Sequence, residues 1–428
     1  MLNLLLVAPT CDGDDVGEAW VAYQWAKRLS ARHRLTLLTY HKQGRIPVSA
    51  QLPGVEVVEW VEPRLFAGME RLNSLLKPGY VPFFLHARAW IRHALAQGRK
   101  FDLAHQCVPV AMRYPSPLAG SGLPYLIGPV GGSLDAPAAF NGVTDTAPWY
   151  VGLRRLDRWR MRLDPLLRRT YEDADCVVGI APYVEEFLAG LSLRRLEFLS
   201  ETGVEALPED VDRSERNGPL RLLFVGRIIK TKGVREAIGA LRHLREAPVR
   251  LDIVGDGFDR ATCEELAAEI GVADKVVFHG HKARGEVDAF YRAADVFVFP
   301  SYREPGGNAP FEAMAWGLPL IVANRGGPAA AVDETSGVLI EPRNPQQMER
   351  EIAEAIERLL VDRSLRLALG AGALRRVARI GLWDQKIRRM EGLYEDVLRA
   401  RGPARLPAAA KAARRENEPV GRPSRGEP

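Results

Sequence analysis

The chain has 428 residues, more than a single hydrophobic core usually holds, so about two domains are expected. Hydrophobic residues make up 46% of the chain and charged residues 26%, which excludes a disordered polypeptide and indicates a soluble globular protein. The formal net charge of +5 agrees only weakly with an anionic partner surface.

The cysteines and the N-terminal residues indicate where in the cell the protein is expected. The four cysteines are scattered without CxxC spacing, which argues against a disulfide framework or metal cluster and favours reduced thiols. Apolar runs stay short of the roughly 18 residues that a membrane-spanning helix needs. Residues 1–9 lack a basic segment and lead into an acidic loop, so they are expected to form a strand rather than a signal peptide. A cytoplasmic protein is expected.

The N-terminal half alternates short apolar runs with helical stretches, a pattern that predicts a doubly wound parallel sheet in a domain at 1–205. A second alternating series predicts another Rossmann-like domain at 218–382, with a polar boundary between them. A closing helix is expected at 383–400, and a disordered basic tail at 402–428. Strands are expected at 2–9, 34–41, 55–60, 101–106, 124–132, 175–182, 220–225, 249–255, 275–280, 296–301 and 318–324.

Arg227 and Lys232 follow the expected strand at 220–225, which Gly226 closes. If this strand and 296–301 share one parallel sheet, the loops after both open on the same carboxyl edge, where α/β sheets bind ligands. The two cations are then placed to neutralise a diphosphate. In the alternative interpretation, Arg227 pairs with a nearby carboxylate and Lys232 is simply solvated.

Two acids follow the strand at 296–301. Pro310 fits the first position of a helix, where its missing N–H costs nothing, so Glu312 falls in the first turn and Glu304 in the preceding loop. Carboxylates at these places are suited to accept hydrogen bonds from hydroxyl groups. The alternative interpretation is a solvated loop charge and an ordinary first-turn acid.

The turn between the acids has the composition of an anion site. Gly306 and Gly307 lack a Cβ atom, so the backbone can approach a ligand closely. The N–H groups of Asn308, Ala309 and the residues after them, together with the helix dipole, favour phosphate. Hydroxyl acceptors on either side of a phosphate cradle suit a sugar diphosphate.

In this order and spacing, the motifs resemble the retaining glycosyltransferases of family 4, also known as group 1 type, which have the GT-B fold of two facing Rossmann-like domains. The resemblance covers about residues 218–345 closely and the N-terminal half more loosely. The motifs are GR followed by KG at 226–233, VGDG at 254–257, FHG at 278–280, ADVFVFPS at 294–301 and E-x7-E at 304–312.

The resemblance implies a role for each matching residue. Arg227 and Lys232 would contact the donor diphosphate and support the departing charge, Glu304 would hold hydroxyls of the donor sugar, and Glu312 would hold those of the ribose. The turn reads EPGGNAPFE where many relatives read EGFGL, so its backbone N–H groups are expected to differ.

Four further candidates lie in the N-terminal half. Gly17 lies in the loop after the first strand, where the resemblance places a glycine-rich turn beside the donor phosphate. His105 corresponds to a DxxH histidine that approaches the donor sugar; the alternative is a hydrogen-bonded structural histidine at a strand end. Gly131 and Gly132 are expected at the cleft on the acceptor side, or simply in a tight turn.

The sequence has no DxD motif or histidine cluster at metal-binding spacing, so a metal-free transfer without cofactor is expected, with the nucleotide sugar as a substrate and the cations stabilising its leaving diphosphate. The resemblance implies that the anomeric configuration is retained. It also places the nucleobase near Gly280 and Lys282.

The acceptor is expected to be a glycan or a lipid-linked sugar in cell-envelope or exopolysaccharide synthesis. Residues 153–169 hold seven arginines among Leu, Trp and Met, and as a helix this stretch would suit the inner face of an anionic membrane. Residues 82–95 form a second basic, aromatic stretch. An ordinary surface helix with solvated arginines fits equally well. Without an RNP, zinc-finger or helix-turn-helix signature, nucleic acid is not expected as a partner.

Two other functions stay open at this point. One is a non-catalytic protein that binds sugar nucleotides or acts as a scaffold, and the other is a different GT-B enzyme such as a sugar-nucleotide epimerase. The joint presence of both cations and both acids argues against a decayed site.

Overall fold

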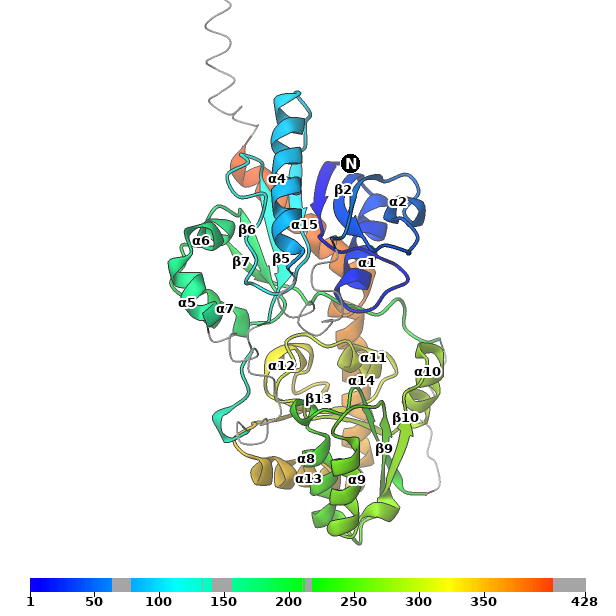
Figure 1. Cartoon of the computed structure of the whole chain (residues 1–428). Helices are drawn as coiled ribbons and strands as arrows, with labels where there is room; N and C mark the ends of the chain where they lie inside the picture. Colours follow the sequence, from blue (N-terminus) through cyan, green and yellow to red (C-terminus); the bar gives the residue numbers. More distant parts are fainter. Residues whose placement is uncertain (64–77, 133, 141–155, 210, 212–217, 403–428) are drawn as a thin grey trace, which may run out of the picture.

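The computed structural model describes residues 1–63, 78–132, 134–140, 156–209, 211 and 218–402. Two α/β domains, each built on a parallel sheet, lie one above the other (Figure 1). The predicted fold class is therefore confirmed. The expectation on the tail at 402–428 lies almost wholly outside the described residues.

The N-terminal domain contains a parallel sheet with strand order β3-β2-β1-β4-β5-β6-β7. Its inner strands form because they are short apolar runs whose side chains are buried on both faces, whereas the edge strands β3 and β7 are only partly buried. The strands are β1 (Asn3–Val7), β2 (Arg34–His41), β3 (Glu56–Val61), β4 (Leu103–Gln106), β5 (Tyr125–Val130), β6 (Cys176–Gly179) and β7 (Leu196–Phe198).

The C-terminal domain repeats the design with the order β10-β9-β8-β11-β12-β13. In both sheets the order reverses next to the first strand, between β1 and β4 and between β8 and β11. Such a reversal leaves a crevice at the carboxyl ends of the strands, where α/β proteins bind ligands. The strands are β8 (Leu220–Val225), β9 (Val249–Val254), β10 (Val276–Gly280), β11 (Val296–Phe299), β12 (Leu320–Ala323) and β13 (Gly337–Ile340).

Helices cover the sheets (Figure 1). Those of the N-terminal domain are α1 (Glu18–Ser30), α2 (Val48–Gln51), α4 (Tyr80–Ala96), α5 (Leu156–Leu163), α6 (Pro165–Glu172) and α7 (Tyr183–Leu188). Those that follow are α8 (Val234–Ala240), α9 (Arg260–Glu269), α10 (Arg284–Ala293), α11 (Ala309–Ala315), α12 (Gly326–Ala331), α13 (Pro345–Val361), α14 (Arg363–Ile380) and α15 (Trp383–Arg401).

The expectation of one helix at 153–169 is wrong for the part that is described. The chain forms α5 and α6 instead, because Asp164 is extended and its carboxylate accepts hydrogen bonds from the N–H groups of Leu166 and Leu167. Pro165 then takes the first helical position, where it needs no N–H partner.

Helix α15 returns to the N-terminal domain. Its residues Trp383, Ile387 and Tyr394 belong to the buried cluster formed by α1 and the first sheet. The two chain segments that cross between the domains pair with each other, since Val204 donates its N–H to Gly381 and accepts one from Trp383, at 2.9 and 3.1 Å. The connection is therefore a hydrogen-bonded double crossing.

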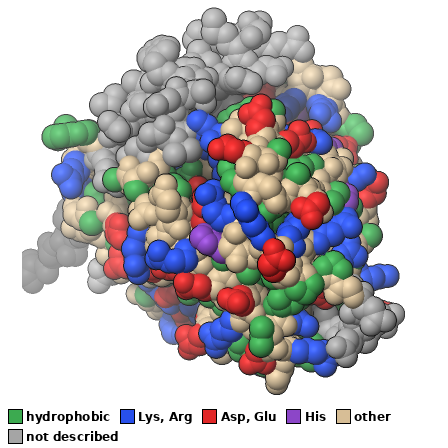
Figure 2. Space-filling view, turned by 90° about the horizontal axis from the view of Figure 1, so that it is seen from below, with side chains coloured by type: hydrophobic (Ala, Val, Ile, Leu, Met, Phe, Trp, Pro, Cys, Tyr) green, Lys and Arg blue, Asp and Glu red, His purple; other side chains and the backbone are tan. Residues whose placement is uncertain are grey.

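The end of the C-terminal domain that points away from its partner domain carries basic and acidic side chains intermingled (Figure 2). The excess positive charge is therefore not gathered on this visible face. Among the described residues, no helix is both long and apolar enough to cross a bilayer.

Candidate functional site

The loops after β8 and β11 lie together because the two strands are neighbours in the sheet. The hydroxyl of Ser301 donates to the carbonyl of Thr231 at 3.1 Å. Gly233 has φ +74°, and a Cβ added there would lie 2.2 Å from the carbonyl oxygen of Pro300. Glycine at this position lets the two loops approach closely enough to bring their charged side chains together.

Lys232 and Glu304 form an ion pair at this junction, with 13% of each side chain exposed. The ammonium also lies 5.4 Å from the centroid of the Phe299 ring. Burial and the positive charge of Arg227 lower the pKa of Lys232 to about 7. The Glu304 carboxylate opposes this shift because it favours the charged ammonium. Two residues 72 positions apart in the sequence thus meet at the switch point.

Arg227 follows β8 and is exposed, close enough to Lys232 to repel its charge. The glycines around it hold the loops after β8 and β9 together. Gly226 has φ +156°, and a Cβ added at Gly255 would lie 1.9 Å from the Gly226 carbonyl oxygen. The basic side chain is thus presented on a closely packed pair of loops.

The turn between the acids is shaped by its glycines. Gly307 has φ +101°, and an added Cβ would lie 2.9 Å from the Cγ atom of Glu304. The sequence predicts Pro310 at the first position of a helix. Helix α11 begins one residue earlier, at Ala309, so Pro310 is its second residue. A single-residue shift of this kind leaves Glu312 in the first turn.

Glu312 is held by two donors. Its carboxylate accepts hydrogen bonds from the Asn308 amide at 2.6 Å and from the Tyr291 hydroxyl at 3.0 Å. The amide oxygen of Asn308 is buried and has no hydrogen-bond partner within the described structure. Because an unpaired buried oxygen is costly, the turn is ready to accept a donor group from a ligand.

Gly280 and Lys282 lie at the end of β10, one side of the same sheet edge. Gly280 has φ +68° and its carbonyl accepts the N–H of Gly255 at 2.9 Å, which joins this loop to the loop after β9. Lys282 is half-buried. Both positions border the region of Arg227 along the sheet, since β9 lies between β10 and β8.

His105 lies in the core with none of its surface exposed. Its Nε2 donates to the Gly128 carbonyl at 2.6 Å, and its Nδ1 accepts the Tyr394 hydroxyl at 2.7 Å. Burial lowers the pKa of His105 to about 4, so the ring is neutral at physiological pH. Both nitrogens are occupied, and this geometry favours the structural alternative over contact with a donor sugar.

Packing and backbone conformation explain why glycine stands at the three candidate positions of the N-terminal domain. A Cβ added at Gly131 would lie 2.1 Å from the Cδ1 of Ile180, and Gly132 has φ +88° with its N–H bonded to a tyrosine hydroxyl. Gly17 is the exposed N-cap of α1 with φ +68°. The positions of Gly131 and Gly132 favour the tight-turn interpretation, and the role expected for Gly17 stays a prediction. The structure does not bring them into contact with the Lys232–Glu304 pair.

Sequence reasoning missed two charged residues beside the turn, Glu201 and Lys386. A Cβ added at Gly306 would lie 2.0 Å from Oε1 of Glu201, and Oε2 of Glu201 is buried without a hydrogen-bond partner among the described residues. Burial raises the pKa of Glu201, while the positive charge of Lys386 opposes the rise. Neither residue belongs to a recognisable sequence motif. They lie near the turn because the two segments that carry them cross between the domains side by side.

A third missed feature is the segment 134–140, which reaches from the first domain onto the second. The ring of Phe140 is fully buried against Tyr302, with 4.2 Å between the centroids. Arg303 donates to the carbonyl of Leu134 at 2.9 Å. Because Tyr302 and Arg303 directly precede Glu304, this segment fixes the start of the acidic loop.

Within the described residues, no three His, Cys, Asp or Glu side chains come together as a metal site would require. The expectation of a metal-free reaction stays a prediction, since this concerns the protein side chains alone.

The arrangement of two facing Rossmann-like domains is shared with solved structures. Sucrose-phosphate synthase from Thermosynechococcus elongatus superposes with a TM-score of 0.64 at 21% identity, over 93% of this chain and 99% of that one. Anabaena Alr3699/HepE in complex with UDP and glucose gives 0.59 at 16% identity, over 92% and 100%. The fold of this chain is therefore the GT-B fold.

The sequence comparisons indicate a family within this fold. Residues 208–376 match the family model described as "Glycosyl transferases group 1". A D-inositol 3-phosphate glycosyltransferase of Xylanimonas cellulosilytica is 36% identical over 189 residues, 43% of this chain and 44% of the relative. An uncharacterized glycosyltransferase, MJ1607 of Methanocaldococcus jannaschii, is 33% identical over 183 residues, 42% of this chain and 46% of the relative.

The chain thus spans less than half the length of these curated relatives. Its C-terminal domain matches the group 1 glycosyltransferase model over residues 208–376, on a chain with the GT-B fold. The resemblance drawn from the motifs is confirmed at this level.

Proposed function

We propose that the protein is a retaining, metal-independent glycosyltransferase of family 4, which moves a sugar from a nucleotide-sugar donor to a glycan or lipid-linked acceptor in cell-envelope or exopolysaccharide synthesis. The observation that carries this proposal is the convergence of Arg227, Lys232 and Glu304 at the switch point of the second sheet. Two cations at this edge suit a diphosphate, and the acid between them and the turn suits a sugar hydroxyl.

Two unpaired buried oxygens, one in the turn and one beside it, support a polyhydroxylated ligand. Asn308 Oδ1 and Glu201 Oε2 are buried acceptors that lack donors in the described structure. Sugar hydroxyls are donors of the right kind, and each bond formed would remove the cost of a buried unpaired oxygen. Glu312, already accepting two hydrogen bonds, has lone pairs left for a ribose.

In this mechanism Lys232 leaves Glu304 and turns to the donor diphosphate as it binds. The negative charge that develops on the departing diphosphate is then stabilised by Lys232 and Arg227 in a half-buried site, where such interactions are stronger than in water. Glu304, released from the ammonium, accepts hydrogen bonds from the donor sugar. The acceptor hydroxyl attacks on the face from which the diphosphate leaves, and its proton passes to a phosphate oxygen.

Thermal unfolding with UDP, GDP, ADP and their common sugar conjugates tests the donor side, because a ligand of the folded state raises its stability. One nucleotide class should raise Tm in the wild type and in Lys230→Ala, but not in Arg227→Ala. Lys230 is the matched control, a lysine in the same loop. Stabilisation by none of the nucleotides, or equal stabilisation of both variants, would contradict the proposal and favour a non-catalytic scaffold.

A transfer assay tests the chemistry. Nucleotide release from the sugar donor should depend on an acceptor and persist in EDTA, and NMR of the product should show the donor's anomeric configuration. Acceptor-independent conversion of the sugar would instead indicate an epimerase. Loss of all turnover in EDTA, restored by a divalent cation, would overturn metal independence.

Helix α5 supports an acceptor at a membrane surface. Trp159 and Leu163 lie four residues apart on it with 64% and 72% of their surface exposed, beside Arg160 and Arg162. An exposed apolar pair within a basic helix suits the interface of an anionic bilayer. Helix α4 likewise exposes an apolar pair, at Val81 and Leu85.

Flotation with vesicles tests this contact. The wild type should float with vesicles of phosphatidylcholine and phosphatidylglycerol, and Trp159→Ser/Leu163→Ser should not. A control pair on the far domain, Val361→Ser/Leu367→Ser, removes two exposed apolar side chains as well and should leave flotation intact. Equal flotation of both pairs would leave α5 as an ordinary surface helix.

A further inference from the structure

A cavity of about 740 Å³ lies at the seam between the two domains. One wall follows the carboxyl ends of β6 and β7, including Phe198 and Ser200, and the opposite wall is formed by α12 and the end of α14. The first turns of α15 close the base. Its size lies in the range of small-molecule sites, which cluster at such domain interfaces.

The ionisable residues that line this cavity are all basic: Arg376, Arg379, Lys386, Arg388 and Arg389. Arg376 is engaged by Asp333, and Arg389 by Glu197 at 2.7 Å. The nearest carboxylate oxygen paired with Arg388 is 4.0 Å away on an exposed aspartate, which is a weak contact. The cavity therefore holds more positive charge than its neighbours neutralise.

Lys386 is buried at the base of the cavity, where burial lowers its pKa to about 7 while the Glu201 carboxylate opposes that shift. Only 1% of its surface is exposed, and its ammonium contacts Ser200 and lies 4.7 Å from the centroid of the Phe311 ring. A buried ammonium is costly unless an anion or several oxygen acceptors surround it. Leu199, Phe311 and Ile380 supply apolar surface next to the cations. This combination suits a ligand with an anionic group attached to a less polar ring.

The cavity borders the acidic loop of the candidate site. Gly327, one of its lining residues, donates its N–H to the carbonyl of Glu304 at 3.0 Å, and a Cβ added there would lie 2.0 Å from the Gly306 carbonyl oxygen. Lys386 acts electrostatically on Glu201, which packs against the other side of Gly306. At Gly327 the cavity therefore lies directly beside the backbone of the turn.

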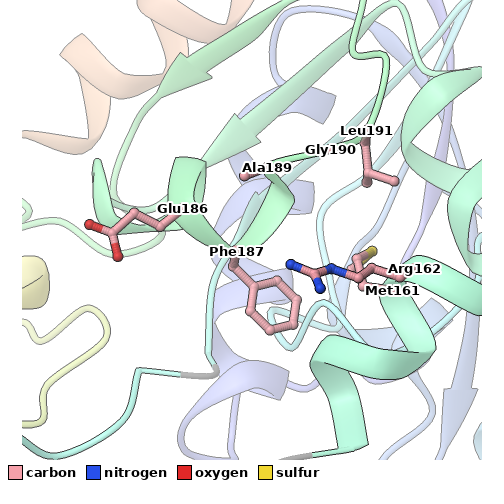
Figure 3. A pocket seen from close by; sticks show the side chains of 7 residues that line it. All are labelled: Met161, Arg162, Glu186, Phe187, Ala189, Gly190 and Leu191. Atoms are coloured by element: carbon pink, nitrogen blue, oxygen red, sulfur yellow. The ribbon is translucent and has the colours of Figure 1, made fainter.

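A cavity of about 180 Å³ beside α5 and α7 is lined by one arginine and one acid, Arg162 and Glu186. In Figure 3 the Arg162 side chain points toward Phe187, whereas Glu186 points away from it. This smaller cavity lies within the first domain and does not include a residue of the acidic loop.

We propose that the interdomain cavity binds the phosphate group of a phosphorylated acceptor, with Arg379 and Arg388 as its principal ligands and Lys386 beneath them. The proposal rests on the proposed function, because the acceptor hydroxyl must reach a donor sugar held near Glu304. Arginine suits this task because its planar guanidinium donates two parallel hydrogen bonds to phosphate oxygens.

Calorimetric titration of the full chain with inorganic phosphate and with glucose 6-phosphate, in the absence of nucleotide, tests the cavity directly. Glucose 6-phosphate should bind to the wild type and bind at least tenfold more weakly to Arg379→Gln/Arg388→Gln, since each substitution removes a charged hydrogen-bond donor. The control Arg375→Gln/Arg399→Gln makes the same charge change on the same two helices outside the cavity, and should bind like the wild type.

A second experiment with lipid vesicles shows whether the phosphate group belongs to a lipid or to a free sugar phosphate. Flotation with phosphatidylcholine vesicles, with and without phosphatidic acid, should reveal binding that the cavity variant loses if the phosphate belongs to a lipid. Binding of glucose 6-phosphate without such flotation indicates a free sugar phosphate. Either result supports the proposal, whereas binding to neither probe, or equal loss in the control variant, overturns it.

Saturation with UDP separates this inference from the proposed function. Donor and acceptor must bind together, so glucose 6-phosphate should still bind to the UDP-saturated protein, and UDP affinity should be unchanged in the cavity variant. Competition between UDP and the sugar phosphate would overturn the acceptor role. If the sugar phosphate binds but no nucleotide does, the result contradicts the proposed function and still supports an anion-binding site in the interdomain cavity.

Discussion

The two sheets have the same architecture, yet their carboxyl edges differ in what they present. After β8 and β11 the loops carry an exposed Arg227 and a half-buried ion pair of Lys232 with Glu304. At the ends of β4 and β5 the residues compared, His105 within β4 and Gly131 after β5, are packed into the core. Among the positions compared, only those of the second edge are charged side chains with exposed surface.

The difference lies in what covers each edge. Helix α15 returns to the first domain and brings Tyr394 onto His105, so this histidine serves to join the helix to the sheet. The second sheet has no such cover over Lys232 in the described structure. A polar side chain at a strand end is thus covered by a helix in the first domain and left partly exposed in the second.

The largest effect is expected at the exposed edge. In the proposed mechanism Lys232 stabilises the leaving diphosphate, so turnover of Lys232→Ala should fall about 100- to 1,000-fold. Initial rates of nucleotide release measure this loss. Lys230→Ala should retain nearly wild-type rates, and equal losses in the two variants would show that the loop, and not the Lys232 charge, is responsible.

At the covered edge, His105→Phe should instead affect stability. It leaves the Tyr394 hydroxyl and the Gly128 carbonyl without partners, which should lower the free energy of unfolding by about 2 to 4 kcal/mol in urea titrations. Nucleotide binding by the folded variant should not change. His243 is exposed, and His243→Phe should cost little. Unchanged stability with lost turnover would place His105 at the substrate after all.

The lowered pKa of Lys232 predicts that donor binding at the second edge depends on pH. A bound diphosphate raises this pKa above its value of about 7 in the free protein. Donor affinity should therefore be full below pH 7 and weaken as the pH rises above 7, with proton uptake on binding. Calorimetry in buffers of different ionisation enthalpy measures that uptake. Lys232→Arg remains protonated and should show neither uptake nor decline, while a similar decline in this variant would assign the titration elsewhere.

A smaller effect is expected at the second acid. Tyr291→Phe removes one hydrogen bond to Glu312 but leaves the one from Asn308, so nucleotide affinity should fall only about three- to tenfold. Direct titration with the nucleotide identified above measures it. Tyr302→Phe, which changes a buried tyrosine on the other side of the loop, should leave the affinity unaltered. An unchanged affinity in Tyr291→Phe would argue against a ribose contact at Glu312.

The fold could be predicted from the sequence because its information is local. Apolar runs of four to eight residues bounded by glycine or proline mark buried strands, and their alternation with helices leaves few topologies. The order of Gly226, Lys232, Glu304 and Glu312 along the chain likewise indicated one edge of one sheet. The break at Asp164 was missed because the periodicity of arginine and leucine continues through it, whereas the cap and Pro165 decide the boundary.

The site could be predicted only in part, for a different reason. Glu201 and Lys386 belong to no motif and lie 185 positions apart, and they come together because two segments cross between the domains side by side. His105 matched a motif, but its environment depends on a helix 289 positions away. Contacts of this length are set by packing and cannot be read from a local pattern.

By itself, then, the sequence determined two parallel α/β sheets, the loops that follow β8 and β11, and the charged residues on those loops. These follow from propensity, periodicity and chain order, which act over a few residues. Only the tertiary structure decided which strand-end residues are buried, which carboxylate meets the Gly306 turn, and where five basic side chains gather at the domain seam. Burial and charge proximity depend on which distant segments share a neighbourhood, and the return of α15 settles that for this protein.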